Sequence, residues 1–146
     1  MKKKLLTYWV LLVVSILLIQ AQQTMSLKLD TEQNSNKLKT NIAIATVENS
    51  INSKISIKAG RAPYYLIFDK KGVFIKSVRN PAINSRQGAS SEVIDLLLKE
   101  SCEIVIAGQF GNKMQNLLKR NNIKFYKKDG IADKVIQSYV KKRRSK

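Results

Sequence analysis

The chain has 146 residues, of which 44% are hydrophobic, and this is enough for one domain with a modest apolar core. It contains no histidine and a single cysteine, Cys102, so imidazole chemistry and an intramolecular disulfide are both excluded. The 27 basic residues outnumber the 10 acidic ones and give a formal net charge of +17, which favours anionic partners such as nucleic acid, phospholipid headgroups or an anionic cofactor.

The amino terminus has the pattern of an export signal. Three lysines at positions 2–4 precede an uncharged, mostly apolar run at residues 5–19, and Ala21 offers a small residue at which signal peptidase could cut. The run is shorter than the minimum of about 17 residues for a membrane span, and an uncleaved anchor is the alternative for residues 1–21. In both cases we expect the remaining chain outside the cytosol, either exported to the periplasm or extracellular space, or held at a membrane through residues 5–19.

Residues 22–40 are polar and lack a helical or strand period, which indicates a flexible linker. We expect the folded domain at residues 41–140 and a basic tail at residues 141–146. Two interpretations of the tail stay open: it is a solvated helix end stabilised by the negative end of the helix dipole, or it contacts an anionic surface.

Five short runs predict strands. Residues 42–47 and 103–107 are apolar and typical of central strands covered on both faces, so we expect them to be adjacent and parallel. Residues 64–68 and 73–78 predict two strands joined by a tight turn, in which Gly72 takes a positive φ. A fifth strand is expected at residues 123–126.

Apolar residues at helical spacing predict three helices. The first begins at Ser90 or Ser91, the second is capped by Asn112, and the third covers residues 132–140. The Asn121-Asn122 pair suits a left-handed exit from the second helix. The order βββαβαβα then predicts an α/β fold with a mixed five-stranded sheet and helices on its faces, in which helix-connected strands are parallel and the first three strands form an antiparallel meander.

Two glycine-containing segments are the most informative part of the chain. Residues 59–69 (AGRAPYYLIFD) lead from a loop into a strand, and residues 104–111 (IVIAGQFG) lead from a strand into a loop that opens a helix. Together with the Asn80-Pro81 pair between them, they resemble the dinitrogenase iron-molybdenum cofactor biosynthesis family, the NifX-like domains also found at the end of NifB. The resemblance extends over residues 41–140 and implies a ribonuclease-H-like fold and cofactor binding without catalysis.

The resemblance places the ligand region at the loop before the second strand and at the loops that open the helices. Physical chemistry points to the same place, because the carboxyl ends of parallel strands leave a crevice into which helix amino termini aim unpaired N–H groups. Glycines there either let the backbone approach a ligand or simply turn the chain, and nearby cations could supply charged donors. The candidate cofactor-binding residues are Lys58, Gly60, Arg61, Arg86, Gly88, Gly108, Gln109, Phe110 and Gly111.

The chain departs from the family pattern at one position that matters for metals. Family members commonly carry His-Phe-Gly-Arg where this chain has Lys-Ala-Gly-Arg at residues 58–61, so a side chain suited to a metal cluster is missing. Cys102 directly precedes an apolar strand and fits a small buried hydrophobe better than a ligand. We therefore assign no metal ligand, and the cofactor stays open, with an iron-molybdenum or iron-sulfur type of cluster implied by the resemblance.

The residues do not favour an enzyme. Only Glu48 follows the first strand, whereas metal-dependent nucleases of this shape need clustered carboxylates, and no serine or cysteine nucleophile has a histidine base. Two functions remain. The first is an exported or membrane-tethered domain that binds an anionic cofactor or metal-sulfur cluster at a glycine-lined crevice. The alternative is a basic interaction protein that binds nucleic acid or an anionic envelope surface, and only this one predicts binding that falls steeply and uniformly with salt.

Overall fold

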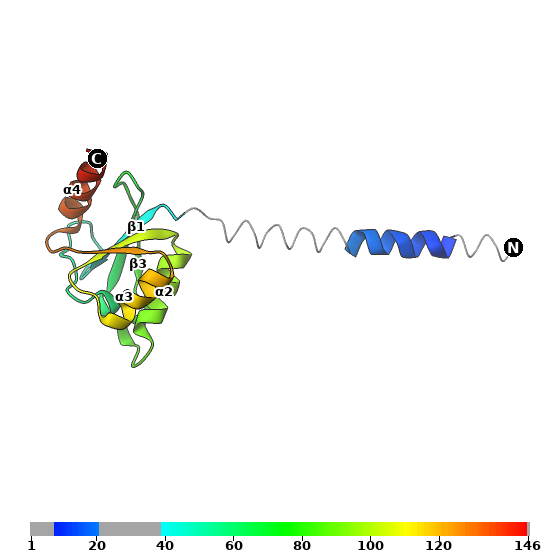
Figure 1. Cartoon of the computed structure of the whole chain (residues 1–146), viewed down its shortest axis with the longest axis horizontal. Coiled ribbons are helices and arrows are strands. Elements are labelled where there is room, and N and C mark those ends of the chain that lie inside the picture. The colour runs from blue at the N-terminus through cyan, green and yellow to red at the C-terminus, as the bar shows by residue number, and fades with distance from the viewer. Residues whose placement is uncertain (1–7, 21–38, 146) are drawn as a thin grey trace. The chain divides into compact units, whose positions relative to one another are not determined.

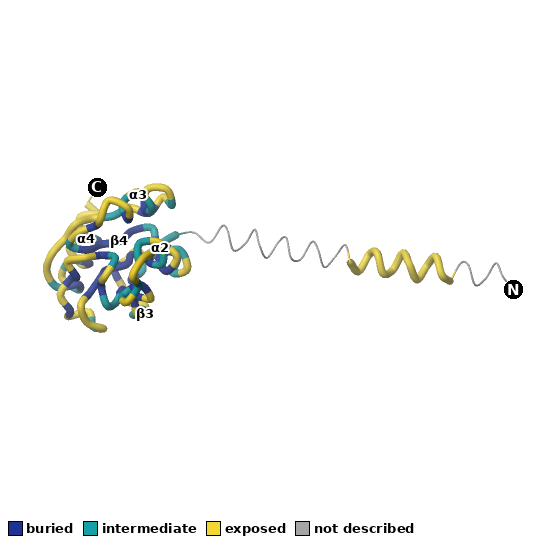
Figure 2. The backbone as a smooth tube through the Cα atoms, turned by 90° about the horizontal axis from the view of Figure 1, so that it is seen from below, coloured by how far each residue is buried: buried dark blue, intermediate teal, exposed yellow. Residues whose placement is uncertain are grey.

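The computed structural model describes residues 8–20 and 39–145, and the chain divides into two compact units, Met1–Lys37 and Leu38–Lys146. In the first unit, residues 8–20 form a helix (Figure 1). Every residue of this helix is exposed (Figure 2). None of the helices in the described part of the chain has the length and apolar character that a membrane crossing requires. Most of the expected linker, and the first residues of the expected export signal, lie outside the described residues.

The second unit is built on one five-stranded sheet. Its strands are β1 (Asn41–Thr46), β2 (Tyr64–Phe68), β3 (Phe74–Arg79), β4 (Cys102–Ala107) and β5 (Lys124–Lys127). They lie in the order β3-β2-β1-β4-β5, with β1 and β2 antiparallel, β2 and β3 antiparallel, and the pairs β1–β4 and β4–β5 parallel. The predicted mixed sheet is confirmed, and so are the adjacent parallel positions of β1 and β4 in its interior.

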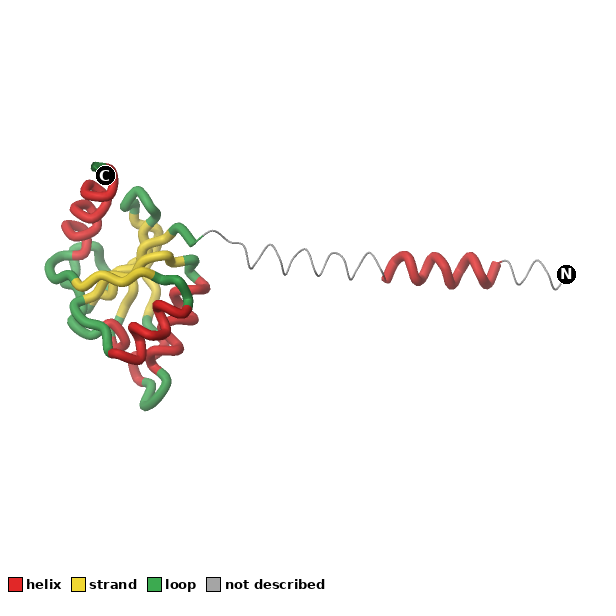
Figure 3. The backbone as a smooth tube through the Cα atoms, viewed as in Figure 1, coloured by secondary structure: helices red, strands yellow, loops and turns green. Residues whose placement is uncertain are grey.

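Three helices and two short 3₁₀ helices cover the sheet: α2 (Ala89–Lys99), α3 (Asn112–Arg120), α4 (Ala132–Arg144), η1 (Ala59–Arg61) and η2 (Pro81–Asn84). Strand side chains alternate between the two faces. In β1, Ala43 and Ala45 belong to the core beneath α2 and α3, whereas Ile42 and Ile44 belong to the core beneath α4. The helices therefore lie on opposite sides of the sheet, as Figure 3 shows, and Figure 2 shows buried residues concentrated in the strands.

All five strands and both cores come from residues 39–145. The two cores hold 28 buried apolar residues, 18 and 10 respectively. The second unit consequently contains the packing interactions that it needs to fold without the helix at residues 8–20.

The predicted starts of the first two helices are wrong by one to three residues, whereas the third helix begins at Ala132 as predicted. The N-cap of α2 is Gly88, with φ of 80°, and the N-cap of α3 is Gly111; neither helix has a side-chain cap. The first intrahelical hydrogen bonds run from Glu92 N to Gly88 O at 3.2 Å and from Gln115 N to Gly111 O at 3.0 Å, and no side-chain oxygen accepts from the first N–H groups of either helix. The prediction relied on a side-chain oxygen at the N-cap, but the N-cap of each of these two helices is a glycine.

The predicted positive φ of Gly72 is confirmed at 85°. Within the Asn121-Asn122 pair, Asn122 is left-handed with φ of 53°, whereas Asn121 has φ of −96°. The third helix is longer than expected, because α4 continues to Arg144. Most of the predicted basic tail is therefore the last turn of α4, where Arg143 donates to Glu103 at 2.8 Å.

The strand register defines two ends of the domain. Thr46 pairs with Tyr64 and Ile42 pairs with Phe68, so the turn between β2 and β3 lies where β1 begins. We call this the amino end of the sheet, and the chain enters the domain there at Lys39. The carboxyl end is where β1, β4 and β5 finish, and it holds η1, η2 and the amino termini of the three helices.

Candidate functional site

The two glycine-containing segments lie side by side at the carboxyl end. Gly108 N donates to Ser56 O at 2.9 Å, and Ala59 N donates to Gln109 O at 3.0 Å. Lys58 and Gln109 form an isolated parallel bridge between these hydrogen bonds. The structure thus brings together the candidate residues in two of the predicted ligand loops, 58–61 and 108–111; the third predicted loop is residues 86–89.

Asn80 holds η1 and η2 together and was not predicted as a site residue. It is 1% exposed. Its Nδ2 donates to Ala62 O at 2.8 Å, and its Oδ1 accepts from Ala82 N at 2.9 Å. The Asn-Pro pair marks this position in the sequence, but the bridge from its side chain to two loops depends on the tertiary arrangement of both loops.

Arg61 reinforces the same junction. Its Nη1 donates to Ala82 O at 3.0 Å and to Ile83 O at 3.4 Å, so the guanidinium is directed along η2. The prediction made Arg61 a donor to a ligand, whereas the structure uses at least part of this side chain to hold η2. Beneath it, the Tyr65 hydroxyl donates to Ala59 O, and burial, followed by the nearby Cys102, raises the pKa of Tyr65 so that it stays protonated.

The glycines at this end have different roles. A Cβ on Gly108 would lie 2.8 Å from Ile57 Cα and 3.0 Å from Ile57 O, so this glycine is required because the Ile57 backbone passes against it. Its N–H is also used by Ser56 O, and the expected backbone approach of a ligand at Gly108 is corrected accordingly. In contrast, a Cβ on Gly60 or Gly111 would meet nothing within 4 Å. Only these two glycines border open space.

The amino terminus of α3 differs electrostatically from those of the neighbouring helices. None of the three helices has a side-chain cap, but the first turn of α2 contains Glu92 and that of α4 contains Asp133, whereas the first turn of α3 has no acidic residue. A helix amino terminus carries about half a positive charge and orphan N–H donors. The α3 terminus, directly after Gly111, is therefore left to attract an outside anion.

The remaining predicted site residues do not join this group. Phe110 is buried and packs on Phe125, with ring centroids 5.2 Å apart. Arg86 is exposed, and Gly88 shapes the start of α2 with its left-handed backbone. No described hydrogen bond joins residues 86–88 to the two glycine-containing segments.

Direct metal ligation does not fit the described residues. Among them, no group of three or more histidine, cysteine, aspartate or glutamate side chains could hold a metal ion. Cys102 is fully buried at the amino end of β4, away from the glycine segments. Asp69 accepts from Lys71 N at 2.8 Å and from Val73 N at 2.9 Å, which confirms it as a turn-forming residue.

Burial, and then the nearby Glu100, raises the pKa of the Cys102 thiol to about 12. We expect the native protein to resist alkylation by iodoacetamide at mildly alkaline pH and to react fully once unfolded in urea, because only the thiolate is nucleophilic. The stabilising effect of keeping the thiol neutral is intact below its usual pKa and is lost as the pH rises toward about 12. Rapid modification of the native protein, followed by mass spectrometry, would contradict this burial.

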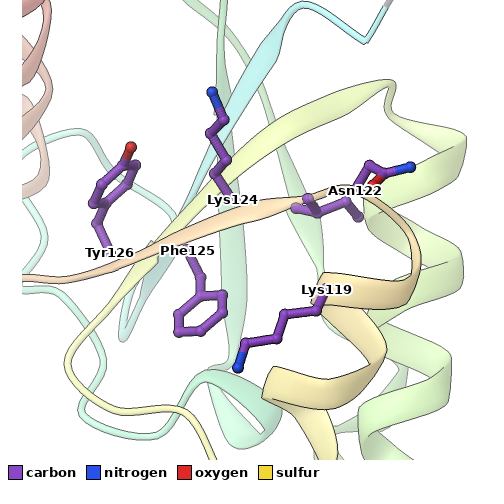
Figure 4. A pocket seen from close by; sticks show the side chains of 6 residues that line it. Lys119, Asn122, Lys124, Phe125 and Tyr126 are labelled. Atoms are coloured by element: carbon purple, nitrogen blue, oxygen red, sulfur yellow. The ribbon is translucent and has the colours of Figure 1, made fainter.

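A groove of about 440 Å³ lies elsewhere, along β5 and the carboxyl terminus of α3 (Figure 4). In Figure 4, Phe125 and Lys119 extend to one side of β5, and Lys124 and Tyr126 extend to the other. Gly111 is at the opposite terminus of α3. This groove is thus separate from the glycine segments and does not enlarge the candidate site.

Comparison with known proteins agrees with the fold. The family model described as dinitrogenase iron-molybdenum cofactor matches residues 40–142. The structure is similar to the apo form of the orange protein from Desulfovibrio gigas, with a TM-score of 0.66 and 20% identity over 71% of this chain and 89% of that chain. It is also similar to a NifB-type protein from Thermotoga, with a TM-score of 0.61 and 23% identity over 71% of this chain and 90% of that chain. A comparison with curated protein sequences gives no match.

Proposed function

The chain belongs to the dinitrogenase iron-molybdenum cofactor family, and from that premise we propose that its domain carries an anionic cofactor at the carboxyl end of the sheet without catalysing a reaction. We propose further that the cargo is a metal-sulfur cluster and that the domain works outside the cytosol, exported or tethered by its amino-terminal segment. The lysines at positions 2–4 and the apolar residues after them support the location.

One observation carries the proposal: Gly111 borders open space directly before the amino terminus of α3, which has no side-chain cap and no acidic residue in its first turn. An anion placed there would accept hydrogen bonds from the first N–H groups of the helix and interact favourably with its dipole. Lys58 is exposed on the adjoining segment and could add a cationic donor. Gly60 borders the same kind of open space on η1.

The donor set favours binding through the outer atoms of the cargo. Since the chain has no histidine and Cys102 is buried elsewhere, the residues present would hold sulfide or oxo groups by N–H and ammonium donors, with no bond from protein to metal. Such charge-assisted hydrogen bonds are each worth roughly 1.5–3 kcal/mol. The site would then accept and release its cargo without breaking a metal–ligand bond, which suits a carrier.

The test measures binding of tetrathiomolybdate, a molybdenum-sulfur dianion, by calorimetry. We expect Gly111→Val to weaken binding by about tenfold or more, because its side chain would fill the open space in front of the α3 terminus. Gly111→Ala, whose single Cβ meets nothing within 4 Å, is the control for folding and should melt like the parent.

Charge is tested separately. We expect Lys58→Gln to weaken tetrathiomolybdate binding, whereas Lys99→Gln, which removes the same charge at the carboxyl terminus of α2, should leave it unchanged. Equal losses from both lysine variants, with unchanged binding by Gly111→Val and a steep uniform salt dependence, would refute the pocket and favour the basic interaction protein instead.

A further inference from the structure

The turn between β2 and β3, at the amino end, exposes three consecutive apolar residues. Val73 is 59% exposed, Phe74 43% and Ile75 48%. Exposed Lys70 and Lys71 precede them. These three residues lie at the tip of a hairpin and belong to neither core. The Phe74 ring makes an edge contact with Phe68, at a centroid distance of 5.7 Å.

Hydrogen bonds within the turn fix the backbone that carries the exposed residues 73–75. The Asp69 carboxylate accepts two backbone hydrogen bonds within the turn, and Gly72 supplies the positive φ that the turn requires. A bulge in the pairing of β2 with β3 leaves Ile75 without a partner residue, so it is freed from the strict alternation of the strand. The apolar tip is thus held outward by a well-defined turn.

The turn is also held against α4. Gln137 Nε2 donates to Gly72 O at 3.3 Å, and a Cβ on Gly72 would lie 3.1 Å from Val140 Cγ2. The last turn of α4, with four basic residues at positions 141–144, therefore ends beside the apolar tip, and Figure 1 shows the hairpin next to the carboxyl terminus. Cationic and apolar side chains share this end of the domain.

Basic side chains outnumber acidic ones at the amino end of the domain. The acidic groups there are engaged: Asp69 forms the turn, Glu100 pairs with Lys76 at 2.7 Å, and Glu103 pairs with Arg143 at 2.8 Å. The helix dipole explains why basic residues are favourable at the carboxyl terminus of a helix. It gives no reason for the exposed Val73 and Ile75 beside those basic residues. The further basic residues at this end are Lys99, Lys119 and Arg120, at the carboxyl termini of α2 and α3.

We propose that the amino end of the domain is a docking surface for an anionic phospholipid bilayer. Val73 and Ile75 enter the boundary between headgroups and acyl chains, while the surrounding lysines contact lipid phosphates. Nucleic acid would use the cations but would gain nothing from exposed aliphatic side chains, so the bilayer is the better match. The docking surface does not depend on the proposed cofactor.

The point at which the chain enters the domain is compatible with this docking. The chain enters the domain at Lys39, at the same amino end, so an attachment of the preceding residues to a membrane would keep the domain close to the bilayer without the chain passing around it. Tethering also raises the effective concentration of a weak docking surface. The candidate cofactor site lies at the opposite end of the sheet and would face away from the membrane, open to exchange of its cargo.

The test uses residues 39–146, which contain both cores, and measures co-sedimentation with vesicles at low salt. We expect binding to vesicles of phosphatidylcholine mixed with phosphatidylglycerol and little binding to phosphatidylcholine alone. Val73→Ser combined with Ile75→Ser is expected to weaken the binding by about tenfold or more. Lys70→Gln combined with Lys71→Gln should weaken it by a similar factor.

The control variants make changes of the same kind, one aliphatic and one charged, at the carboxyl end of the sheet. Ile57→Ser removes an aliphatic side chain that is 67% exposed, and Lys54→Gln with Lys113→Gln removes two charges; both should retain binding. Circular dichroism melts confirm that every variant is folded. The proposal is overturned if the parent domain ignores phosphatidylglycerol, if the Val73 and Ile75 change has no effect, or if the control lysine pair weakens binding as much as Lys70 and Lys71 do.

Discussion

Replacing Gly108 by alanine is expected to destabilise the domain strongly, by roughly 1–3 kcal/mol or more. The new Cβ would lie 2.8 Å from Ile57 Cα and 3.0 Å from Ile57 O, and both are backbone atoms that no side-chain rotation can move away. Relief requires the segment before η1 to shift, which also strains the hydrogen bond from Gly108 N to Ser56 O. The loss of stability should therefore be accompanied by a loss of the candidate site.

The measurement is urea unfolding followed by circular dichroism, comparing midpoints at constant slope. Gly111→Ala is the matched control, three residues further along the same segment, since its Cβ meets nothing within 4 Å and its φ of −66° suits alanine. We expect that control to stay within about 0.5 kcal/mol of the parent. Equal stability of the two variants would show that the Ile57 backbone does not pass against Gly108 as described.

Replacing Asn80 by alanine is expected to destabilise the domain by about 2–4 kcal/mol. The change leaves the Ala62 carbonyl and the Ala82 N–H without their side-chain partner inside the protein, and an unmet buried polar group costs more than a hydrogen bond gains. Because Asn80 joins η1 to η2, the change should also loosen the Gly60 side of the candidate site and weaken tetrathiomolybdate binding.

Asn84→Ala is the control for this prediction. Asn84 lies in the same short helix η2, but it is exposed and its side chain makes no hydrogen bond to the described residues. We expect thermal unfolding to show a drop in melting temperature of several degrees for Asn80→Ala and little change for Asn84→Ala. A drop of the same size in both variants would place the effect in η2 generally and contradict the bridging role of Asn80.

Much of the fold could be predicted because it depends on local patterns. The apolar runs of β1 and β4 indicate strands that are covered on both faces, and the structure confirms them as adjacent, parallel and interior. The strand at Tyr64–Phe68 was predicted with its observed bounds. The starts of α2 and α3 were missed because a glycine, and no residue with a side-chain oxygen, occupies the N-cap of each.

The site could be predicted only in outline. The glycine segments and the helix amino terminus follow from sequence pattern, and the structure brings residues 58–61 and 108–111 together. The role of each residue depends on what lies opposite it in space. Gly108 faces the Ile57 backbone, Arg61 holds η2, and Phe110 packs on Phe125, whereas Gly111 faces open space.

Composition alone determines that this protein cannot use histidine, cannot form an intramolecular disulfide and carries a large positive charge, because these properties are independent of folding. Pattern determines the order of strands and helices, since side-chain periodicity is local. Only the tertiary structure decides that exposed Val73 and Ile75 share an end with the basic last turn of α4, while the candidate cofactor site occupies the other end. The physical reason is that strand register and helix direction, which set the two ends, arise from contacts between residues far apart in the chain.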